Sequence, residues 1–137
     1  MDKHYGIKEI AILSGISEHT LRYYEKNGLI HSISRDTKGH RLYSEQDLGW
    51  IRFLVRLRTT GMSIRQMQEI AELRRQGPAT SKERRVLLEA HQQKVTEHIE
   101  QLQEHMEALV TKIAEYREWE KELEEKNGRK SNESNNF

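Results

Sequence analysis

The side chains of this sequence that could bind a ligand are mainly cationic, and they form two groups in its N-terminal half. Arg22 and Lys26 lie on either side of the aromatic Tyr23 in the first group. The second group contains Arg35, Lys38, His40 and Arg41. Arginine pairs with phosphate oxygens or with the edge of guanine, and lysine neutralises phosphate. The two groups are therefore suited to contacts with a nucleic acid, but a surface arginine beside an aromatic ring and an exposed hairpin with charged side chains explain these residues equally well.

Formal charge is unevenly distributed along the chain, although it sums to +1. Residues 1–76 contain 13 Lys and Arg against 9 Asp and Glu, a net charge of +4, whereas residues 77–137 contain 10 against 13, a net charge of −3. The basic part is the candidate for binding a polyanion. An excess of this size is modest, so charge by itself does not distinguish a nucleic-acid-binding protein from other classes.

The residue types in this sequence argue against metal binding and redox chemistry. The sequence has no cysteine, which excludes disulfides, thiolate metal sites and cysteine-held iron–sulfur clusters. His91, His98 and His105 recur every seven residues, about 10.5 Å along a helix, which is too far for consecutive imidazoles to share one ion. We therefore expect no metal site and no cofactor. We interpret these histidines as positions that flank a coiled-coil seam, and the Glu-rich run 115–125 as a solvated helix face.

Length and composition exclude further classes of protein. A chain of 137 residues has room for one compact domain and an extended element, and its 33% of charged residues indicates a large solvated surface. No apolar run approaches the length that crosses a bilayer, so we expect a cytoplasmic protein without membrane contacts. The sequence contains no recognisable arrangement of nucleophile and base and no phosphate-binding glycine loop, so we predict no enzymatic activity.

Two short helices joined by a tight turn should carry the first cationic group. Apolar residues follow helical spacing from Ile7 to a break at Ser14-Gly15, where glycine suits an inter-helix turn. Ser17 is a good N-cap for the next helix, which places Leu21 on an inner face and Arg22 on an outer one.

The second cationic group falls in a segment without helical periodicity, from Leu29 to Tyr43. Residues 36–39 form a turn signal between two short stretches that could pair, so we predict a small β-wing. We expect Tyr43 to pack this wing onto the head, with its hydroxyl still able to reach a phosphate.

Two further helices follow the predicted wing. Ser44 with Asp47, and Ser63 with Gln66, have the spacing of reciprocal helix caps. Gly61 is expected to end the first of these helices.

After Gly77-Pro78, the sequence predicts a helix that is capped by Thr80 with Glu83 and continues to about Lys126. At about 1.5 Å per residue it would be roughly 70 Å long, too long to be buried on so small a domain. Its apolar residues alternate at three- and four-residue steps, the seam of a coiled coil: Leu88, Val95, Ile99, Leu102, Met106, Leu109, Ile113, Tyr116 and Leu123. Residues 127–137 are polar, and we predict a disordered tail.

Several motifs keep a characteristic order and spacing over about residues 4–76. They are Thr20-Leu21-Arg22-Tyr23-Tyr24-Glu25, Gly28-Leu29-Ile30, Gly39-His40-Arg41-Leu42-Tyr43, Asp47-Leu48 and Gly61-Met62-Ser63-Ile64. On these residues the sequence closely resembles the MerR family, the mercury-resistance type of bacterial transcription regulator. A match of several ordered elements is far more specific than one short motif.

The resemblance implies a mainly α fold with a winged helix-turn-helix DNA-binding head at residues 4–76 and a dimerisation helix at residues 80–126. Two such helices would form an antiparallel coiled coil, with the apolar seam as the dimer interface. The homodimer would bind pseudo-palindromic, double-stranded promoter DNA and control transcription by bending and untwisting it, so that contacts with RNA polymerase realign. The predicted DNA-binding residues are Ser17, His19, Thr20, Arg22, Tyr23, Lys26, Arg35, Lys38, His40, Arg41 and Tyr43.

The sequence departs from the family in features that concern the effector. Metal- and redox-sensing relatives use cysteines, and drug-sensing relatives append a large pocket domain, whereas this chain lacks cysteine and has fewer than 15 residues after Leu123. A small-molecule effector or stress signal is therefore expected without being identified. Two other hypotheses stay open: an architectural DNA-binding protein without an effector, against which the long helix argues, and a protein scaffold, against which Arg22, Tyr23 and Arg41 argue.

Overall fold

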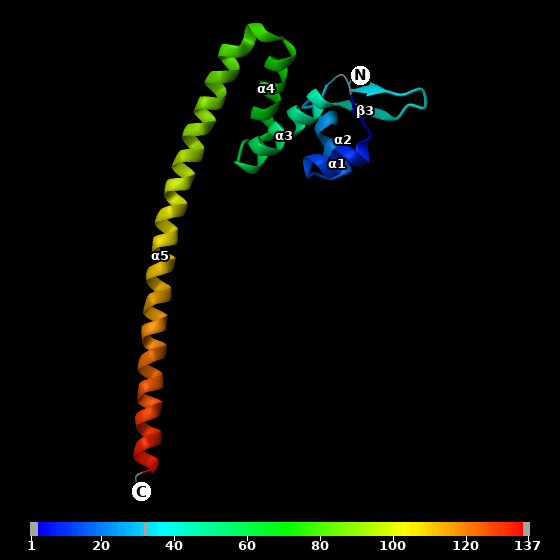
Figure 1. Ribbon diagram of the computed structural model, residues 1–137. Helices are drawn as coiled ribbons and strands as arrows, with labels where there is room; N and C mark the ends of the chain where they lie inside the picture. The colour runs from blue at the N-terminus through cyan, green and yellow to red at the C-terminus, as the bar shows by residue number, and fades with distance from the viewer. Residues whose placement is uncertain (1–2, 32, 136–137) are drawn as a thin grey trace. The chain divides into compact units, whose positions relative to one another are not determined.

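The computed structural model describes residues 3–31 and 33–135. The chain divides into two units, Met1–Val95 and Thr96–Phe137. The first unit contains a head of short helices and strands, and the second consists of part of one long helix (Figure 1). The N-terminal head carries both cationic groups predicted from the sequence.

The head begins with two helices joined by a tight turn. α1 (Ile7–Ser14) ends at Gly15, whose φ of 76° lies in the left-handed region that glycine adopts without a steric penalty. α2 (Glu18–Lys26) is capped by Ser17, whose side chain accepts a hydrogen bond from the backbone N–H of Thr20 at 3.0 Å. The turn and the cap confirm the helix-turn-helix predicted from the sequence.

A three-stranded antiparallel sheet lies beside these helices, with the strand order β1-β3-β2 (Figure 1). β2 (Ser34–Arg35) and β3 (Arg41–Ser44) form the predicted wing hairpin. β1 (His4–Tyr5) pairs with the other edge of β3 and was not predicted. A strand of two residues is too short to show an alternating hydrophobic pattern, so it could not be predicted from the sequence.

Two capped helices complete the head. The Ser44 side chain accepts a hydrogen bond from the Asp47 N–H at 3.1 Å, and the Asp47 carboxylate accepts one from the Ser44 N–H at 2.8 Å, so α3 (Glu45–Thr59) has the predicted reciprocal cap. Ser63 and Gln66 form the same arrangement at the start of α4 (Ile64–Arg75). Both predicted caps are confirmed.

The segment after α4 differs from the prediction. A single turn of 3₁₀ helix, η1 (Pro78–Thr80), leads directly into α5 (Ser81–Asn135). We expected Thr80 to cap α5 with Glu83, but the Thr80 hydroxyl donates to the carbonyls of Leu73 and Gly77. The expected cap was wrong because Thr80 belongs to the 3₁₀ turn, where its hydroxyl faces the end of α4 instead of the start of α5.

The end of α5 also differs from the prediction. The helix continues to Asn135, whereas the sequence predicted an end near Lys126 followed by a disordered tail from residue 127. Residues 136–137 of that tail lie outside the described residues. Gly128 costs a helix about 1 kcal/mol relative to alanine. A helix that is already nucleated nevertheless gains one hydrogen bond for each residue it adds, and the sequence has no proline after Pro78 that would end it.

One hydrophobic core joins the helices and the sheet of the head. Its largest fully buried side chains are Tyr43, Ile10, Leu21, Leu29, Ile51, Leu54, Met67 and Ile70. Leu88 near the start of α5 is partly buried and packs against this core, a contact that the sequence did not predict, and its place in the dimer seam stays a prediction. The first turns of α5 belong to the same unit as the head.

Trp50 of α3 links three parts of the head. Its indole N–H donates to the carbonyl of Leu29 at 2.7 Å, and the guanidinium of Arg74 lies 4.4 Å from the centre of its ring. This distance is that of a cation–π contact. Burial of the Arg74 side chain lowers its pKa, which remains far above neutrality in arginine.

From Ile99 onward, the predicted seam of α5 is an exposed apolar stripe. Its side chains are each about half exposed: Ile99, Leu102, Met106, Leu109, Ile113, Tyr116 and Leu123. The rings of Tyr116 and Trp119 meet edge to face, with their centres 5.0 Å apart. Within the described ranges, no helix combines the length and the apolar character needed to cross a bilayer.

Replacing Ser44 with alanine should lower the free energy of unfolding of the head by about 0.5–2 kcal/mol, because it removes the side chain that caps α3. The measurement is urea unfolding followed by circular dichroism. Ser34→Ala, at an exposed position of β2, is the control and should change stability little. Equal stability of the wild type and Ser44→Ala would contradict the energetic role of this cap.

Candidate nucleic-acid interface

The outer face of α2 presents the first cationic group to solvent. His19, Arg22, Tyr23 and Lys26 are exposed, whereas Leu21 and Tyr24 on the opposite face are buried. Arg22 is only weakly paired, with its guanidinium 3.8 Å from the Glu18 carboxylate. The ring of Tyr23 is exposed as well, so α2 offers both a cation and an aromatic surface for a groove or a phosphate.

Ser17 and Thr20 are placed at the start of the same helix. Besides capping the Thr20 N–H, the Ser17 hydroxyl donates to the Thr20 hydroxyl at 3.0 Å. Their first role is thus to fix the end of α2. Ser17 nevertheless remains exposed and Thr20 partly exposed, at the helix end where positively polarised backbone favours anions.

The wing is stabilised by its own side chains. The Asp36 carboxylate accepts hydrogen bonds from the backbone N–H groups of Lys38 and His40, each at 2.9 Å, and the Arg35 guanidinium donates to the Gly39 carbonyl at 2.8 Å. Gly39 has a φ of 83°, which the turn requires. Arg35, Lys38 and His40 are all exposed, so this closed turn holds three basic side chains at the surface.

The last two predicted wing residues are placed differently from each other. Arg41 is partly buried, and its Nε lies 2.6 Å from an oxygen of Glu25 on α2. Tyr43 is only 1% exposed, and among the described residues its hydroxyl has no hydrogen-bond partner. Burial first, and the nearby Glu25 charge second, raise the pKa of Tyr43. A hydroxyl so deeply buried is not presented to a phosphate, so we correct this part of the predicted site and assign Tyr43 to the core.

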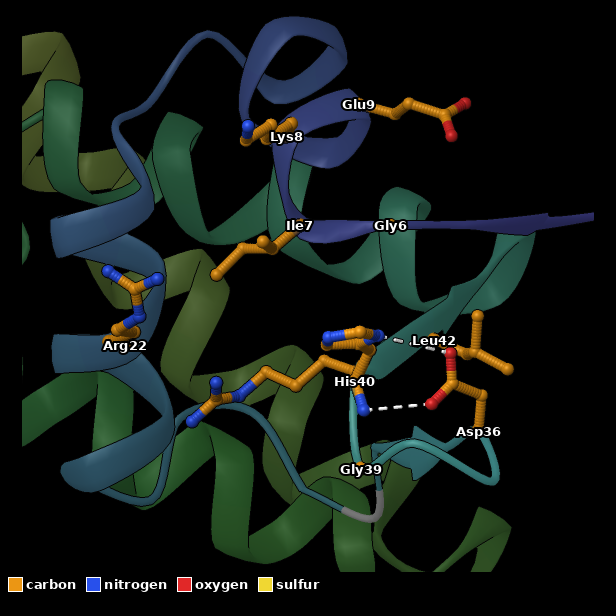
Figure 2. A pocket seen from close by; sticks show the side chains of 10 residues that line it. Gly6, Ile7, Lys8, Glu9, Arg22, Asp36, Gly39, His40 and Leu42 are labelled. Carbon is orange, nitrogen blue, oxygen red and sulfur yellow. Dashed lines mark hydrogen bonds and ion pairs between the residues drawn. The ribbon is translucent and has the colours of Figure 1, made fainter.

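A pocket of about 500 Å³ lies between the start of α1, α2 and the wing. Figure 2 shows Arg22 on one side of it, His40 and Asp36 on the other, and Ile7 between them. Four basic side chains line the pocket, Lys8, Arg22, His40 and Arg41, against the acidic Glu9 and Asp36. The structure thus brings Arg22, His40 and Arg41 together from the predicted set, in a concave surface with an excess of positive charge.

The contribution of α1 to this pocket was not predicted from the sequence. Gly6 precedes α1 and provides no side-chain cap, and Ile7, Lys8 and Glu9 of the first turn line the pocket wall. The uncapped N–H groups of a helix start attract anions. The short strand β1, which the sequence did not predict, fixes this segment beside β3. The exposed Lys8 near a helix start was the one available signal.

The three histidines of the heptad spacing have different surroundings on α5. His91 lies 2.7 Å from the hydroxyl of Thr60, whereas His98 and His105 are exposed on α5. Over residues 3–31 and 33–135, no three or more side chains of the metal-binding types gather in one place. The hydrogen bond to Thr60 gives His91 a structural partner at the end of α3.

Two family models match the chain. One, described as "MerR HTH family regulatory protein", matches residues 5–73, which include α1, α2, the wing and most of α4. The other, described as "MerR, DNA binding", matches residues 48–111. The matches cover the candidate interface and a large part of α5.

Individual relatives agree with these models. A transcriptional regulator of the helix-turn-helix type from Haemophilus influenzae is 36% identical over 112 residues, which cover 82% of this chain and 83% of the relative. The crystal structure of HiNmlR, described as a MerR family regulator lacking the sensor domain and bound to promoter DNA, superposes with a TM-score of 0.79 at 34% identity, over 85% of this chain and 92% of that one. A MerR-type regulator from Listeria monocytogenes gives a TM-score of 0.77 at 37% identity, over 82% and 85%.

The Asp36 carboxyl should titrate below its ordinary pKa. The His40 backbone N–H is the main cause. Burial opposes it as the second-largest effect, and the Lys38 N–H and the His40 side chain lower the pKa further. Because the pKa is lower in the folded state, the stability it adds is present above the unfolded value of about 3.9 and is lost as pH falls through the folded value. Carboxyl-carbon NMR against pH measures the shift. His40→Ala should reduce it without abolishing it; a midpoint at or above the ordinary value would contradict the hydrogen bonding described.

Proposed function

The chain belongs to the MerR family of helix-turn-helix transcriptional regulators, and on this premise we propose that it binds pseudo-palindromic promoter DNA as a homodimer and controls transcription by bending and untwisting that DNA. It is a DNA-binding regulator, and its relatives are regulators rather than enzymes. The observation that best supports the proposed binding of promoter DNA is the cationic pocket between the start of α1, α2 and the wing.

The proposed contacts divide between the two cationic groups. The outward face of α2, with His19, Arg22, Tyr23 and Lys26, is assigned to the major groove, because a helix fits that groove and arginine can read guanine there. The wing residues Arg35, Lys38, His40 and Arg41 are assigned to backbone phosphates beside the groove. The excess of basic side chains around the pocket supports a phosphate at this position.

The exposed apolar stripe of α5 supports the proposed dimer. Half-exposed side chains such as Leu102 and Leu109 recur at coiled-coil spacing over several turns, and pairing with a second copy would remove them from water. Burying each such side chain contributes about 1.5–3 kcal/mol of transfer free energy. A dimer of this kind carries two heads, which suits two half-sites about one helical turn apart.

Promoter distortion and a response to an effector or stress complete the proposal. Realignment of the promoter would act on RNA polymerase, and we place the protein in the cytoplasm, where bacterial DNA and polymerase are located. HiNmlR, described as lacking a sensor domain and bound to promoter DNA, supports promoter binding by a head of this kind. The same long helix argues against a purely architectural protein without an effector, because bending alone does not require it.

Replacing Arg22 with alanine should leave the fold intact and weaken binding to the preferred duplex by about 1–3 kcal/mol if Arg22 reads a base. A duplex selected by the wild type from a random-sequence pool serves as probe, and binding is measured by fluorescence anisotropy at several salt concentrations. Wild-type affinity should fall steeply with salt because phosphate contacts release counterions.

Arg85→Ala is the matched control for this variant. Both arginines lie on a helix, pair with a glutamate four residues away and have side-chain exposures of 55% for Arg22 and 59% for Arg85. Arg85→Ala should bind DNA like the wild type. Unchanged affinity in a folded Arg22→Ala protein, or a wild type that binds unrelated duplexes equally well at all salt concentrations, would contradict the proposed interface.

Changing Leu102 and Leu109 together to lysine should produce a monomer that retains a folded head. The substitutions place two charges in the proposed seam, where burial and mutual repulsion oppose pairing. Sedimentation velocity measures the oligomeric state, and operator binding should weaken with it, because a single head engages one half-site.

Gln101→Lys with Ala108→Lys is the matched control, because it adds the same two charges to α5 one position outside the seam. This control should remain a dimer and bind DNA. A monomeric seam variant with wild-type operator affinity would show that α5 does not couple two heads.

A further inference from the structure

An ion pair joins the proposed recognition helix to the wing. We propose that Glu25 is a positioning residue, which holds Arg41 and the outer part of the wing against α2 in the geometry that the DNA requires. This inference rests on the proposed function, since it concerns the same interface. Glu25 itself does not line the pocket, so it acts through Arg41 and not by contact with DNA.

The geometry of the pair differs from that of the surface pairs around it. Arg41 Nε lies 2.6 Å from Glu25 Oε2, and the two side chains are only 26% and 27% exposed. In the neighbouring pair on α2, a guanidinium nitrogen of Arg22 lies 3.8 Å from a carboxylate oxygen of Glu18, and the two side chains are 55% and 36% exposed. A short, partly buried, charge-assisted hydrogen bond is less screened by salt than an exposed pair and holds one geometry more firmly.

The wing needs such an attachment beyond Tyr43. β3 is fixed at its C-terminal end, where Tyr43 and Ser44 pair with β1 and Tyr43 enters the core. Alternate residues of a strand point to the same face, so Arg41 follows Tyr43 on the side that faces the head. Farther out, β2 is the pairing partner of β3 and is itself exposed. Among residues 3–31 and 33–135, the Glu25–Arg41 contact is the one ion pair between α2 and the wing.

The pair also determines which donors Arg41 presents. A guanidinium carries five N–H donors, and Glu25 accepts from Nε. The terminal amino groups remain on the part of the side chain farthest from the strand, and Arg41 lines the same pocket as Arg22. Because Nε is held, the plane of the guanidinium is fixed. Its remaining donors then face one phosphate and do not sample many directions.

Charge and positioning predict opposite effects of removing Glu25. A carboxylate near phosphates repels them, so if its charge were its only influence, replacing it with glutamine would strengthen binding to every duplex. If Glu25 positions Arg41, the same replacement weakens binding to the preferred duplex. The sign of the change therefore separates the two roles.

The experiment compares Glu25→Gln with Glu18→Gln in the full-length protein. Each variant removes one negative charge from α2, but only the first removes the wing contact. The probes are a duplex selected by the wild type from a random pool and a scrambled duplex of the same composition. Glu25→Gln should bind the selected duplex about tenfold more weakly than the wild type, and its affinity should depend less on salt, by about one phosphate contact. Glu18→Gln should bind the same duplex as tightly as the wild type or slightly more tightly.

A double-mutant cycle with Arg41→Gln tests whether Glu25 acts through Arg41. The double variant should bind no more weakly than Arg41→Gln alone. In the free protein, hydrogen exchange of the wing amides should be faster in Glu25→Gln than in Glu18→Gln, with circular dichroism unchanged in both.

Three results would overturn the inference. They are a Glu25→Gln protein with wild-type affinity and salt slope, an additive loss in the double variant, and unchanged exchange of the wing amides. Failure of the proposed function gives a different result, since the wild type itself would then show no preference for the selected duplex. In that event, the exchange measurement still decides whether Glu25 holds the wing.

Discussion

Burial of the Tyr43 side chain is the interaction on which the head depends. It fixes β3 in the core, and the neighbouring residues of this short strand then meet different parts of the structure. Ser44 caps α3, Arg41 pairs with Glu25 of α2, and Tyr43 itself pairs with Tyr5 of β1. A four-residue strand thus sets the positions of the wing, of α1 through β1, and of the start of α3.

This arrangement explains how so small a head builds a concave, basic surface. The pocket walls come from the start of α1, from α2 and from the wing. These are three separate segments of the sequence, and they meet because each is fixed to β3 or to the core beside it. The basic side chains are long and solvated, so they cannot organise the surface themselves. Their positions follow from apolar packing and from partly buried partners such as Glu25.

Local signals in the sequence predicted most of the helix caps of the head, although the cap expected at Thr80 was wrong. The caps by Ser17, Ser44 and Ser63 were predictable because each depends on residues within one helical turn. Features that depend on contacts distant in sequence were not: the strand β1, the burial of the Tyr43 hydroxyl, and the packing of Leu88 on the head. Of the candidate site, the exposed residues of α2 were predictable from helical periodicity, whereas the pairing of Arg41 with Glu25 was not, because no short motif encodes it.

The two tryptophans divide between the two units of the chain. Trp50 belongs to the head, where its indole N–H donates to the carbonyl of Leu29 and its ring lies under the guanidinium of Arg74. Trp119 lies half exposed on α5, and its ring contacts that of Tyr116. Indole emission responds to solvent and to nearby charges, so each unit carries its own optical reporter. Intrinsic fluorescence therefore contains two signals of different origin, and a phenylalanine at either position leaves a spectrum that follows one unit alone.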